Sequence, residues 1–251
     1  MSLSVIVITR NEETNLQRCL ESVRFADQIV VVDSGSTDGT VDIARLFNAE
    51  LYQIEWAGFG EAKQFALSRA KSEWVLSIDA DEEVSVELAG EIKRIITQAD
   101  SAAGYQMPRL TNFLGKWIYH CGWYPDRVVR LFRRTAGRFT PDIVHERVVV
   151  DGRVGRCKGH LLHYSYPSLE IYFEKFNRYT TEGAELEASR GKIAGPFDLT
   201  IRPGVAFIKH YISKAGFLDG IEGLMISALS AVAVFVKYAK LRDRNRQKLS
   251  Q

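Results

Sequence analysis

The sequence has few cysteines, almost no net charge and no long uninterrupted apolar run. Its three cysteines, Cys19, Cys121 and Cys157, are far apart and form no CxxC pair. This spacing argues against a disulfide framework or a zinc cage and is typical of a reducing compartment. Because the formal net charge is only +2, the molecule as a whole is not a polyanion binder, and we expect no nucleic-acid partner.

Two kinds of membrane signal are also missing from the sequence. The start, MSLSVIVITRNEE, lacks the basic region, long apolar region and cleavage site of a secretory signal. The longest apolar stretch, LMISALSAVAVFV (224–236), is shorter than the roughly 20 residues that a membrane-spanning helix needs. The sequence therefore predicts a protein that is neither secreted nor membrane-spanning.

The first hundred residues alternate between strand and helix patterns. Such alternation predicts an α/β fold with right-handed crossovers and a mostly parallel central sheet flanked by helices. In these sheets the ligand lies outside the carboxyl ends of the strands, where Thr9, Asp33 and Asp79 are expected. The predicted strands are LSVIVIT (3–9), QIVVVD (28–33), AELYQIEW (49–56) and EWVLSID (73–79).

The character of the chain changes after about residue 104. Short mixed strands rich in arginine and aromatic residues predict a smaller antiparallel element that completes a cleft, and helices follow from residue 168. We therefore divide the chain into residues 1–103, 104–200 and 201–251, the last of them a helical C-terminal extension.

The fourth predicted strand ends in a cluster of acids, VLSIDADEEV (75–84). Asp79 and Asp81 suit a hard divalent cation, which needs one or two carboxylates beside water or phosphate. Equally, an acidic turn can cap the helix that follows. The sequence contains neither GxxxxGK[ST] nor GxGxxG, which disfavours a P-loop or a dinucleotide site.

Three separated motifs carry a family resemblance: SVIVITRNEETNLQRCLESV, IVVVDSGSTDGTVDIA and WVLSIDADEEV. In this order and spacing the chain resembles the family-2 inverting glycosyltransferases with the GT-A (nucleotide-diphospho-sugar transferase) fold. The later segments RLFRR, FTPDIVHERVVVDGRVG, LLHYSY and GFLDGIEGLMISALSAVAVFVKYAKL are similar to the bacterial lipopolysaccharide inner-core β-1,4-glucosyltransferases. The resemblance implies that 1–103 binds the nucleotide-sugar and 104–200 the acceptor, and that glucose passes from UDP-glucose to a heptose hydroxyl.

The resemblance also implies roles for residues of the donor half. Thr9, Arg10, Asn11 and Glu13 would approach the uridine from the end of the first strand. The other implied contacts are Asp33 to the base or ribose, Asp79 to the ribose or the metal, and Lys63 to the nucleotide. Arg130, in the arginine-rich segment RLFRR, suits a phosphate group of the donor or of the acceptor. The implied metal ligands for Mg²⁺ or Mn²⁺ are Asp81 and Asp79.

Inversion requires a carboxylate that takes the proton of the acceptor hydroxyl, and the resemblance places it at Glu146 in TPDIVHERV. Asp142 is the alternative base, and Glu146 can instead pair with a neighbouring arginine on an exposed strand. His145 and His163 can contact the diphosphate, ligate the ion or play structural parts. Trp123 and the aromatic residues near it can stack on sugar rings or belong to the core.

The C-terminal segment combines an apolar helix with a basic end. Leu224, Ile226, Leu229, Val232, Val236 and Ala239 approximate one helical face, and six basic residues against one acid follow from Lys237 to Lys248. This pattern predicts either an interfacial helix on anionic lipid or a core helix with a frayed tail. Together with the resemblance it indicates a cytoplasmic protein, peripheral on the inner membrane, with a lipid-linked saccharide acceptor. A polyprenyl-phosphate sugar synthase and a non-catalytic nucleotide-sugar- or membrane-binding protein are the alternatives.

Overall fold

The computed structural model describes residues 2–98, 102–140 and 147–249, and these fall into two compact units. Unit 1 comprises Met1–Leu110 and Asp126–Tyr164, and unit 2 comprises Thr111–Pro125 and Ser165–Gln251. The chain passes from one unit to the other within strands β6 (Gly104–Phe113) and β12 (Leu161–Tyr166). The functional division at residues 103 and 200 stays a prediction.

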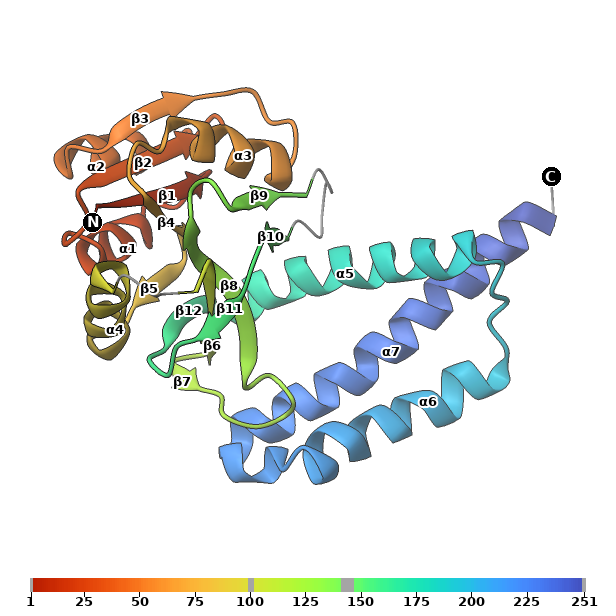
Figure 1. The fold of residues 1–251 in the computed structure, drawn as a ribbon. Coiled ribbons are helices and arrows are strands. Elements are labelled where there is room, and N and C mark those ends of the chain that lie inside the picture. The colour runs from red at the N-terminus through yellow and green to blue at the C-terminus, as the bar shows by residue number, and fades with distance from the viewer. Residues whose placement is uncertain (1, 99–101, 141–146, 250–251) are drawn as a thin grey trace. The chain divides into compact units, whose positions relative to one another are not determined.

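The first part of unit 1 is a parallel sheet in the order β3-β2-β1-β4 (Figure 1). Its strands are β1 (Leu3–Thr9), β2 (Gln28–Asp33), β3 (Glu50–Gln53) and β4 (Trp74–Asp79). β1 is buried along its whole length because its apolar residues meet helices on both faces. The predicted strands and their parallel arrangement are confirmed.

The antiparallel strands extend this sheet and do not form the separate smaller element that the sequence predicted. β8 (Asp126–Arg133) pairs with β4, and β6 pairs with β8. β5 (Glu82–Val84) pairs antiparallel with β12, whereas β11 (Val154–Arg156) is parallel to β6. Only β9 (Gly137–Phe139) and β10 (Val148–Val150) make a two-stranded sheet of their own within the described residues.

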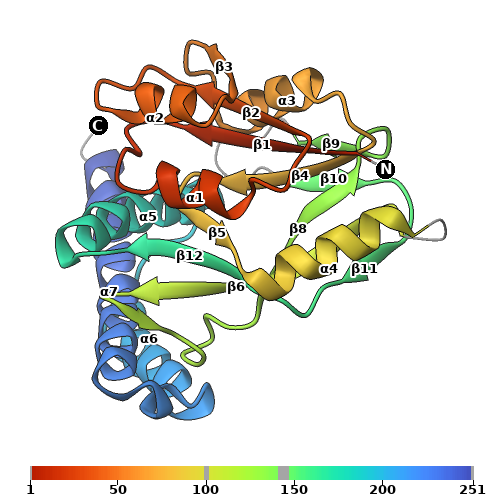
Figure 2. The same cartoon turned by 90° about the vertical axis from the view of Figure 1, so that its left-hand side faces the viewer.

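Two apolar layers hold the helices of unit 1 on the sheet. α1 (Leu16–Ser22), α2 (Thr40–Leu46) and α4 (Val86–Thr97) contribute to one cluster with β1 and β4, and Figure 2 shows α1 and α4 on the same face. α3 (Phe59–Arg69) packs on the opposite face with β9. A sheet covered in this way leaves its carboxyl edge as the open place for polar residues.

Unit 2 consists mainly of three long helices, α5 (Leu169–Ser189), α6 (Pro196–Ile208) and α7 (Gly220–Leu249). It also holds β7 (Lys116–Trp117), which pairs with the end of β6. Between α6 and α7 lie a π turn (Lys209–Ser213) and a 3-10 turn (Gly216–Asp219). Positive φ angles of 51° at Ala215 and 66° at Gly220 reverse the chain between α6 and α7.

α7 is apolar on more than one face, which differs from the single face that the sequence predicted. Ile226 is buried, whereas Leu224 and Val232 are exposed. The stretch Gly216–Gln247 contains an 18-residue window of mean hydropathy 1.7, long and apolar enough to cross a membrane by length and composition alone. The shortness of 224–236 therefore does not by itself exclude a span.

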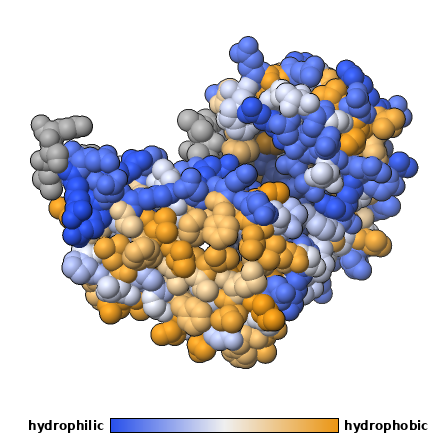
Figure 3. Space-filling view, turned by 180° about the vertical axis from the view of Figure 1, so that it is seen from behind, coloured by the Kyte–Doolittle hydropathy of each residue, from blue (hydrophilic) through white to orange (hydrophobic). Residues whose placement is uncertain are grey.

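The surface of α6, the turn after it and α7 exposes many large apolar side chains, which we name the apolar helix surface. Figure 3 shows a broad apolar area of the molecule from behind. The members of this surface are Phe197, Ile201, Val205, Ile208, Ile212, Phe217, Leu218, Ile221, Leu224, Val232 and Phe235.

Candidate functional site

Three residues named from the sequence meet at the carboxyl edge of the parallel sheet. In the strand register Thr9 lies beside Asp33, and Ile8 lies beside Asp79. The ends of β2, β1 and β4 therefore bring Asp33, Thr9 and Asp79 next to one another, as expected for strands that run in one direction. All belong to unit 1.

The buried carboxylate of Asp33 organises the turn after β2. It accepts hydrogen bonds from the backbone N–H groups of Gly35 and Ser36, each at 3.0 Å, and from the Ser36 hydroxyl. Gly35 has a φ of 83°, a conformation that glycine adopts without strain. Asp33 can therefore both stabilise this turn and contact a ligand, because its carboxylate fixes the backbone of the turn beside the site.

The loops after β1 and β2 are hydrogen-bonded to each other. The Asn11 side chain accepts from the Thr37 N–H at 2.8 Å, and the Glu13 carboxylate accepts from the Gly39 N–H at 2.8 Å. Asn11 has a φ of 55°, in the left-handed region that asparagine tolerates better than most residues. Arg10, beside Asn11, is exposed. Asn11 and Glu13 therefore join two strand ends into one rim.

The polar atoms that are buried near this edge without a hydrogen-bond partner among the described residues include Thr9 Oγ1, Ser34 Oγ, Arg130 Nε and His163 Nδ1. Thr9 and Ser34 are adjacent, because the Ser34 N–H donates to the Thr9 carbonyl at 3.0 Å. A buried polar group without a partner costs roughly 1–3 kcal/mol and calls for an explanation such as a ligand. The two hydroxyls therefore mark this edge as a place for a polar ligand.

A cluster of alternating charges lies at the end of β4. Asp79 Oδ1 is 2.8 Å from the ammonium of Lys63, and its other oxygen contacts Arg130 at 2.5 Å. Arg130 also contacts Glu82 at 2.7 Å, and Glu82 lies 3.4 Å from Arg109. The side chain of Glu82 is fully buried, and those of Lys63 and Arg130 nearly so. Each charge in the cluster thus has an opposite charge beside it.

The ion pairs in this cluster determine the charge states of Asp79 and Arg130. Burial alone would raise the pKa of Asp79, but the charges of Arg130 and Lys63 hold that pKa well below its ordinary value. Burial would lower the pKa of Arg130, and the charges of Asp79 and Glu82 raise it instead. Both groups are therefore ionised at neutral pH.

The second acid of the motif, Asp81, faces a histidine. Its Oδ2 atom is 3.2 Å from Nε2 of His163, which lies on β12. The neighbouring Glu83 accepts a hydrogen bond at 2.8 Å from the hydroxyl of Tyr164, and Arg18 stacks 3.5 Å above that tyrosine ring. The pairing of β5 with β12 brings Asp81 to His163 and Glu83 to Tyr164, although the partners are some eighty residues apart in the chain.

The donor chemistry of the site fits a divalent ion at Asp81 better than at Asp79. Both oxygens of Asp79 are already within contact distance of a cation, which disfavours a metal there. Asp81 with His163 offers one carboxylate and one imidazole, to which water and a diphosphate can add. Within the described ranges, no group of three or more His, Cys, Asp or Glu residues is placed to hold a metal by itself.

The other arginines of the segment RLFRR do not lie at this edge. Arg133 pairs with Glu73 and Arg134 donates to the Ser72 carbonyl, at the amino end of β4, because β8 runs antiparallel to β4. Glu146, Asp142 and His145 lie outside the described residues.

The sequence reasoning did not single out Glu82 or Arg109, and it left the part of His163 open. Glu82 was read only as one of several acids in a turn, yet β5 buries it. In β5 the adjacent acids Glu82 and Glu83 precede Val84, so no alternation of apolar and polar residues marks this strand or the burial of Glu82 in the sequence.

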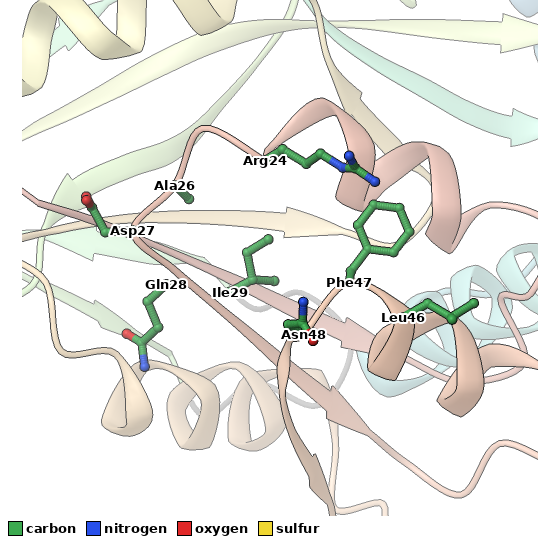
Figure 4. A pocket seen from close by; sticks show the side chains of 8 residues that line it. All are labelled: Arg24, Ala26, Asp27, Gln28, Ile29, Leu46, Phe47 and Asn48. Carbon is green, nitrogen blue, oxygen red and sulfur yellow. The ribbon is translucent and has the colours of Figure 1, made fainter.

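A hollow of about 400 Å³ in unit 1 lies away from this edge (Figure 4). It is lined by residues at the start of β2 and the end of α2, among them Gln28, Ile29 and Phe47. Since β2 ends at Asp33, this hollow belongs to the amino edge of the sheet. We assign it no part in the site.

Comparison with known proteins identifies the class. Residues 4–150 match glycosyl transferase family 2. The chain is 31% identical over 98% of its length to the lipopolysaccharide core biosynthesis glycosyltransferase LpsC of Rhizobium meliloti (strain 1021), covering 93% of that protein. It is 33% identical over 96% of its length to the uncharacterized glycosyltransferase RP128 of Rickettsia prowazekii (strain Madrid E), covering 87% of it.

Two solved structures are similar at low identity. S. aureus TarS 1–349 is 18% identical with a TM-score of 0.49, over 99% of this chain and 92% of that one. Glucosyl-3-phosphoglycerate synthase from Mycobacterium tuberculosis, in complex with Mn²⁺ and UDP-glucose, is 21% identical with a TM-score of 0.39, over 43% of each chain.

The protein belongs to glycosyl transferase family 2. The predicted family and the GT-A fold, with its mostly parallel sheet flanked by helices and its helical C-terminal extension, are thereby confirmed. The edge that holds Asp33, Asp79 and Asp81 lies within the matched residues, so it is the candidate active site of a transferase.

Proposed function

We propose that the protein is an inverting glycosyltransferase that moves glucose from UDP-glucose to a hydroxyl of a lipid-linked saccharide. The acceptor that we propose is a heptose of the lipopolysaccharide inner core. The similarity to LpsC, over nearly the whole of both chains, supports an acceptor of this class.

The observation that carries the proposal is the composition of the carboxyl edge of the sheet. Thr9, Asp33 and the rim made by Asn11 and Glu13 offer hydroxyl, carboxylate and amide groups to a nucleoside. Lys63 lies just behind them and contributes a positive charge. Polar groups that converge on one edge of a covered α/β sheet are what a nucleotide-sugar requires.

We further propose that the transferase uses Mg²⁺ or Mn²⁺, held by Asp81 with His163 beside it. When bound, the ion would stabilise negative charge on the departing diphosphate as a Lewis acid. Asp79, paired with Lys63 and Arg130, would orient the ribose by accepting hydrogen bonds. The fixed positive charges of Lys63 and Arg130 would also favour the diphosphate electrostatically.

Transfer with inversion needs a general base, and we keep Glu146 as that base with Asp142 as the alternative. The base would take the proton of the acceptor hydroxyl as the new glycosidic bond forms and the bond to UDP breaks. General-base help of this kind is typically worth roughly 10² to 10⁴-fold in rate.

We propose that the protein acts at the cytoplasmic face of the inner membrane through the apolar helix surface. Exposed Lys209 and Lys214 lie in the turn between α6 and α7 and would suit anionic lipid headgroups. α7 packs against both α5 and α6, and its Tyr238 and Leu241 are buried in unit 2. A helix held by two neighbours favours a surface position over a span.

Activity and its dependence on named residues test the reaction. UDP release would be measured with a panel of UDP-sugars, with Mg²⁺, Mn²⁺ or EDTA, and with or without a heptose-terminated lipopolysaccharide. Wild type would be compared with Asp81→Asn and Glu146→Gln, and with Asp42→Asn as an exposed control on α2. We expect acceptor- and metal-dependent release with UDP-glucose, reduced at least about 10²-fold by the first two changes only.

Other outcomes would redirect each part of the proposal. Activity that survives Glu146→Gln would move the base to Asp142 or indicate a phosphate acceptor, as in a polyprenyl-phosphate sugar synthase. Full activity in EDTA would remove the metal. Tight UDP binding without transfer to any acceptor would indicate a binding protein. Failure to co-sediment with vesicles of phosphatidylethanolamine and phosphatidylglycerol would refute the membrane surface.

A further inference from the structure

Unit 2 contains a cavity of about 290 Å³, and all of its lining residues belong to unit 2. Its wall is formed by α5, α7, the end of β12 and Trp123 from the segment before β8. The lining is dominated by the aromatic side chains of Trp123, Tyr166, Tyr172, Phe176 and Tyr179. A pocket near the lower end of the usual range of roughly 300–1,000 Å³ accommodates one small ring and not an extended molecule.

The aromatic wall is built by mutual edge contacts and is therefore stiff. Trp123 and Tyr166 have ring centroids 5.4 Å apart, and Tyr166 and Tyr172 have theirs 5.2 Å apart. Behind them, buried Phe113 meets Trp123, Tyr166 and Tyr172 edge to face. Rings held in this way present flat apolar faces in fixed positions.

Polar groups accompany the rings around the same cavity. Thr180, Ser230 and Lys237 line it together with the three tyrosines. Burial, and after it the neighbouring Tyr166, raises the pKa of Tyr172 to about 12, so its hydroxyl stays neutral and able to donate at physiological pH. Flat apolar faces beside hydroxyl and ammonium groups match a sugar ring, which has an apolar face and a rim of hydroxyls.

The position of the cavity on α7 separates it from the apolar helix surface. Ser230, Ala233 and Lys237 are spaced three and four residues apart and share one face of the helix. Val232 and Phe235 are exposed and, at 3.6 residues per turn, point to the other side. An acyl chain in a bilayer would meet the second face, so the cavity is better suited to a saccharide than to lipid.

We propose that this cavity is a saccharide-binding subsite for one pyranose ring of the acceptor, separate from the edge that binds the nucleotide-sugar. The inference rests on the proposed function for the identity of the saccharide as acceptor. The rings of Trp123 and Tyr179 stack on the sugar, and Lys237 with the tyrosine hydroxyls binds its hydroxyl groups. The subsite selects acceptors by a sugar other than the one that receives glucose.

The experiment fills the cavity and measures saccharide binding directly. Ala233→Leu places a larger side chain in the cavity, and Ala228→Leu makes the same change at an exposed position of the same helix. Tyr179→Ala removes a half-exposed ring from the cavity, and Leu186→Ala is its control at an equally exposed position of α5. Binding of a de-acylated core oligosaccharide is measured by saturation-transfer NMR without donor, and steady-state kinetics give KM for acceptor and donor.

We expect Ala233→Leu and Tyr179→Ala to weaken oligosaccharide binding and to raise the acceptor KM by about tenfold, the effect of losing a well-packed ring contact. The donor KM and the melting temperature should match those of the control variants. If Ala233→Leu does not fold, Tyr179→Ala decides the question.

Two results would overturn the subsite. Wild-type transfer with an acceptor KM that neither variant changes would refute it while leaving the proposed function intact. Displacement of the oligosaccharide by lauric acid at lower concentration would identify an acyl-chain pocket instead. Conversely, binding that Ala233→Leu abolishes, in a protein that transfers glucose to no acceptor, would support the subsite and refute the proposed reaction.

Discussion

Replacing Arg130 by methionine tests whether the buried charge cluster behind the site is held together by this one cation. Arg130 is 6% exposed and contacts both Asp79 and Glu82, at 2.5 and 2.7 Å. Methionine has a similar length and no charge, so the change removes the cation shared by two carboxylates. Breaking a buried ion pair on one side typically costs about 3–5 kcal/mol, because a charge is left without its partner.

This cost is a large part of the roughly 5–15 kcal/mol by which a folded protein is stable. For a chain of this size it corresponds to a fall in melting temperature of about 6–20 °C. Arg127→Met is the matched control, since Arg127 lies on the same strand, is exposed and donates to the Cys157 carbonyl at 3.4 Å. It should change the free energy of unfolding by no more than about 1 kcal/mol.

The pH dependence of the stability difference between the wild type and Arg130→Met tests the same prediction independently. In the wild type the depressed pKa of Asp79 stabilises the fold above the ordinary carboxyl pKa, and this contribution is lost as the pH falls through the folded pKa. In the variant the partly exposed Asp79 lacks its strongest cation, so its pKa rises and protonation at mildly acidic pH removes the unpaired charge. The difference between the two proteins should therefore shrink from pH 7 to pH 4.5.

Urea unfolding followed by circular dichroism at pH 7, 5.5 and 4.5 measures this difference, with thermal melts in parallel. An Arg130→Met protein as stable as Arg127→Met at pH 7 would show that the cluster does not depend on its central cation. A destabilisation of the same size at all three pH values would refute the electrostatic account of it.

Three further predictions concern other parts of the chain. The three cysteines are buried, and burial raises the pKa of the Cys157 thiol to about 12. Ellman's reagent at pH 8 should therefore react with none of them in the folded protein and with all of them in denaturant. The ammonium of Lys240 lies within hydrogen-bond distance of four acceptors on α5. Lys240→Met should therefore lower the free energy of unfolding by about 1–3 kcal/mol, whereas the exposed control Lys209→Met should lower it by less than about 0.5 kcal/mol. Gly35→Ala should cost about 1–2 kcal/mol through its φ of 83°, whereas Gly90→Ala on the exposed face of α4 should stabilise by about 0.5–1.

The parallel part of the fold was predictable from sequence because its information is local. β-branched runs end at Thr9, Asp33 and Asp79, and the direction of the strands then places those ends on one edge. The position of Thr9, Asp33 and Asp79 at that edge followed for the same reason, whereas the roles proposed for them rest on the family resemblance.

The rest of the site depends on pairings between distant segments, which local patterns do not encode. Glu82 is buried only because β12 covers β5, and His163 reaches Asp81 through the same pairing. Lys63 could be named only through the resemblance, because a single lysine on a helix carries no local sign of burial, and its contact with Asp79 joins α3 to the end of β4. In the C-terminal segment the periodicity of α7 could not separate the face that packs on α5 from the face that is exposed.

The contacts of Arg130 and His163 set a limit on how the enzyme can be divided. Both residues come from beyond residue 103, yet they fix the charge of Asp79 and the surroundings of Asp81. A fragment ending near residue 103 would keep every donor motif and lose the cation and the strand that hold the acids in place. The proposed donor half, residues 1–103, is therefore not a self-sufficient structural unit, and chimaeras designed to exchange the proposed acceptor half must keep β8 and β12 with the first hundred residues.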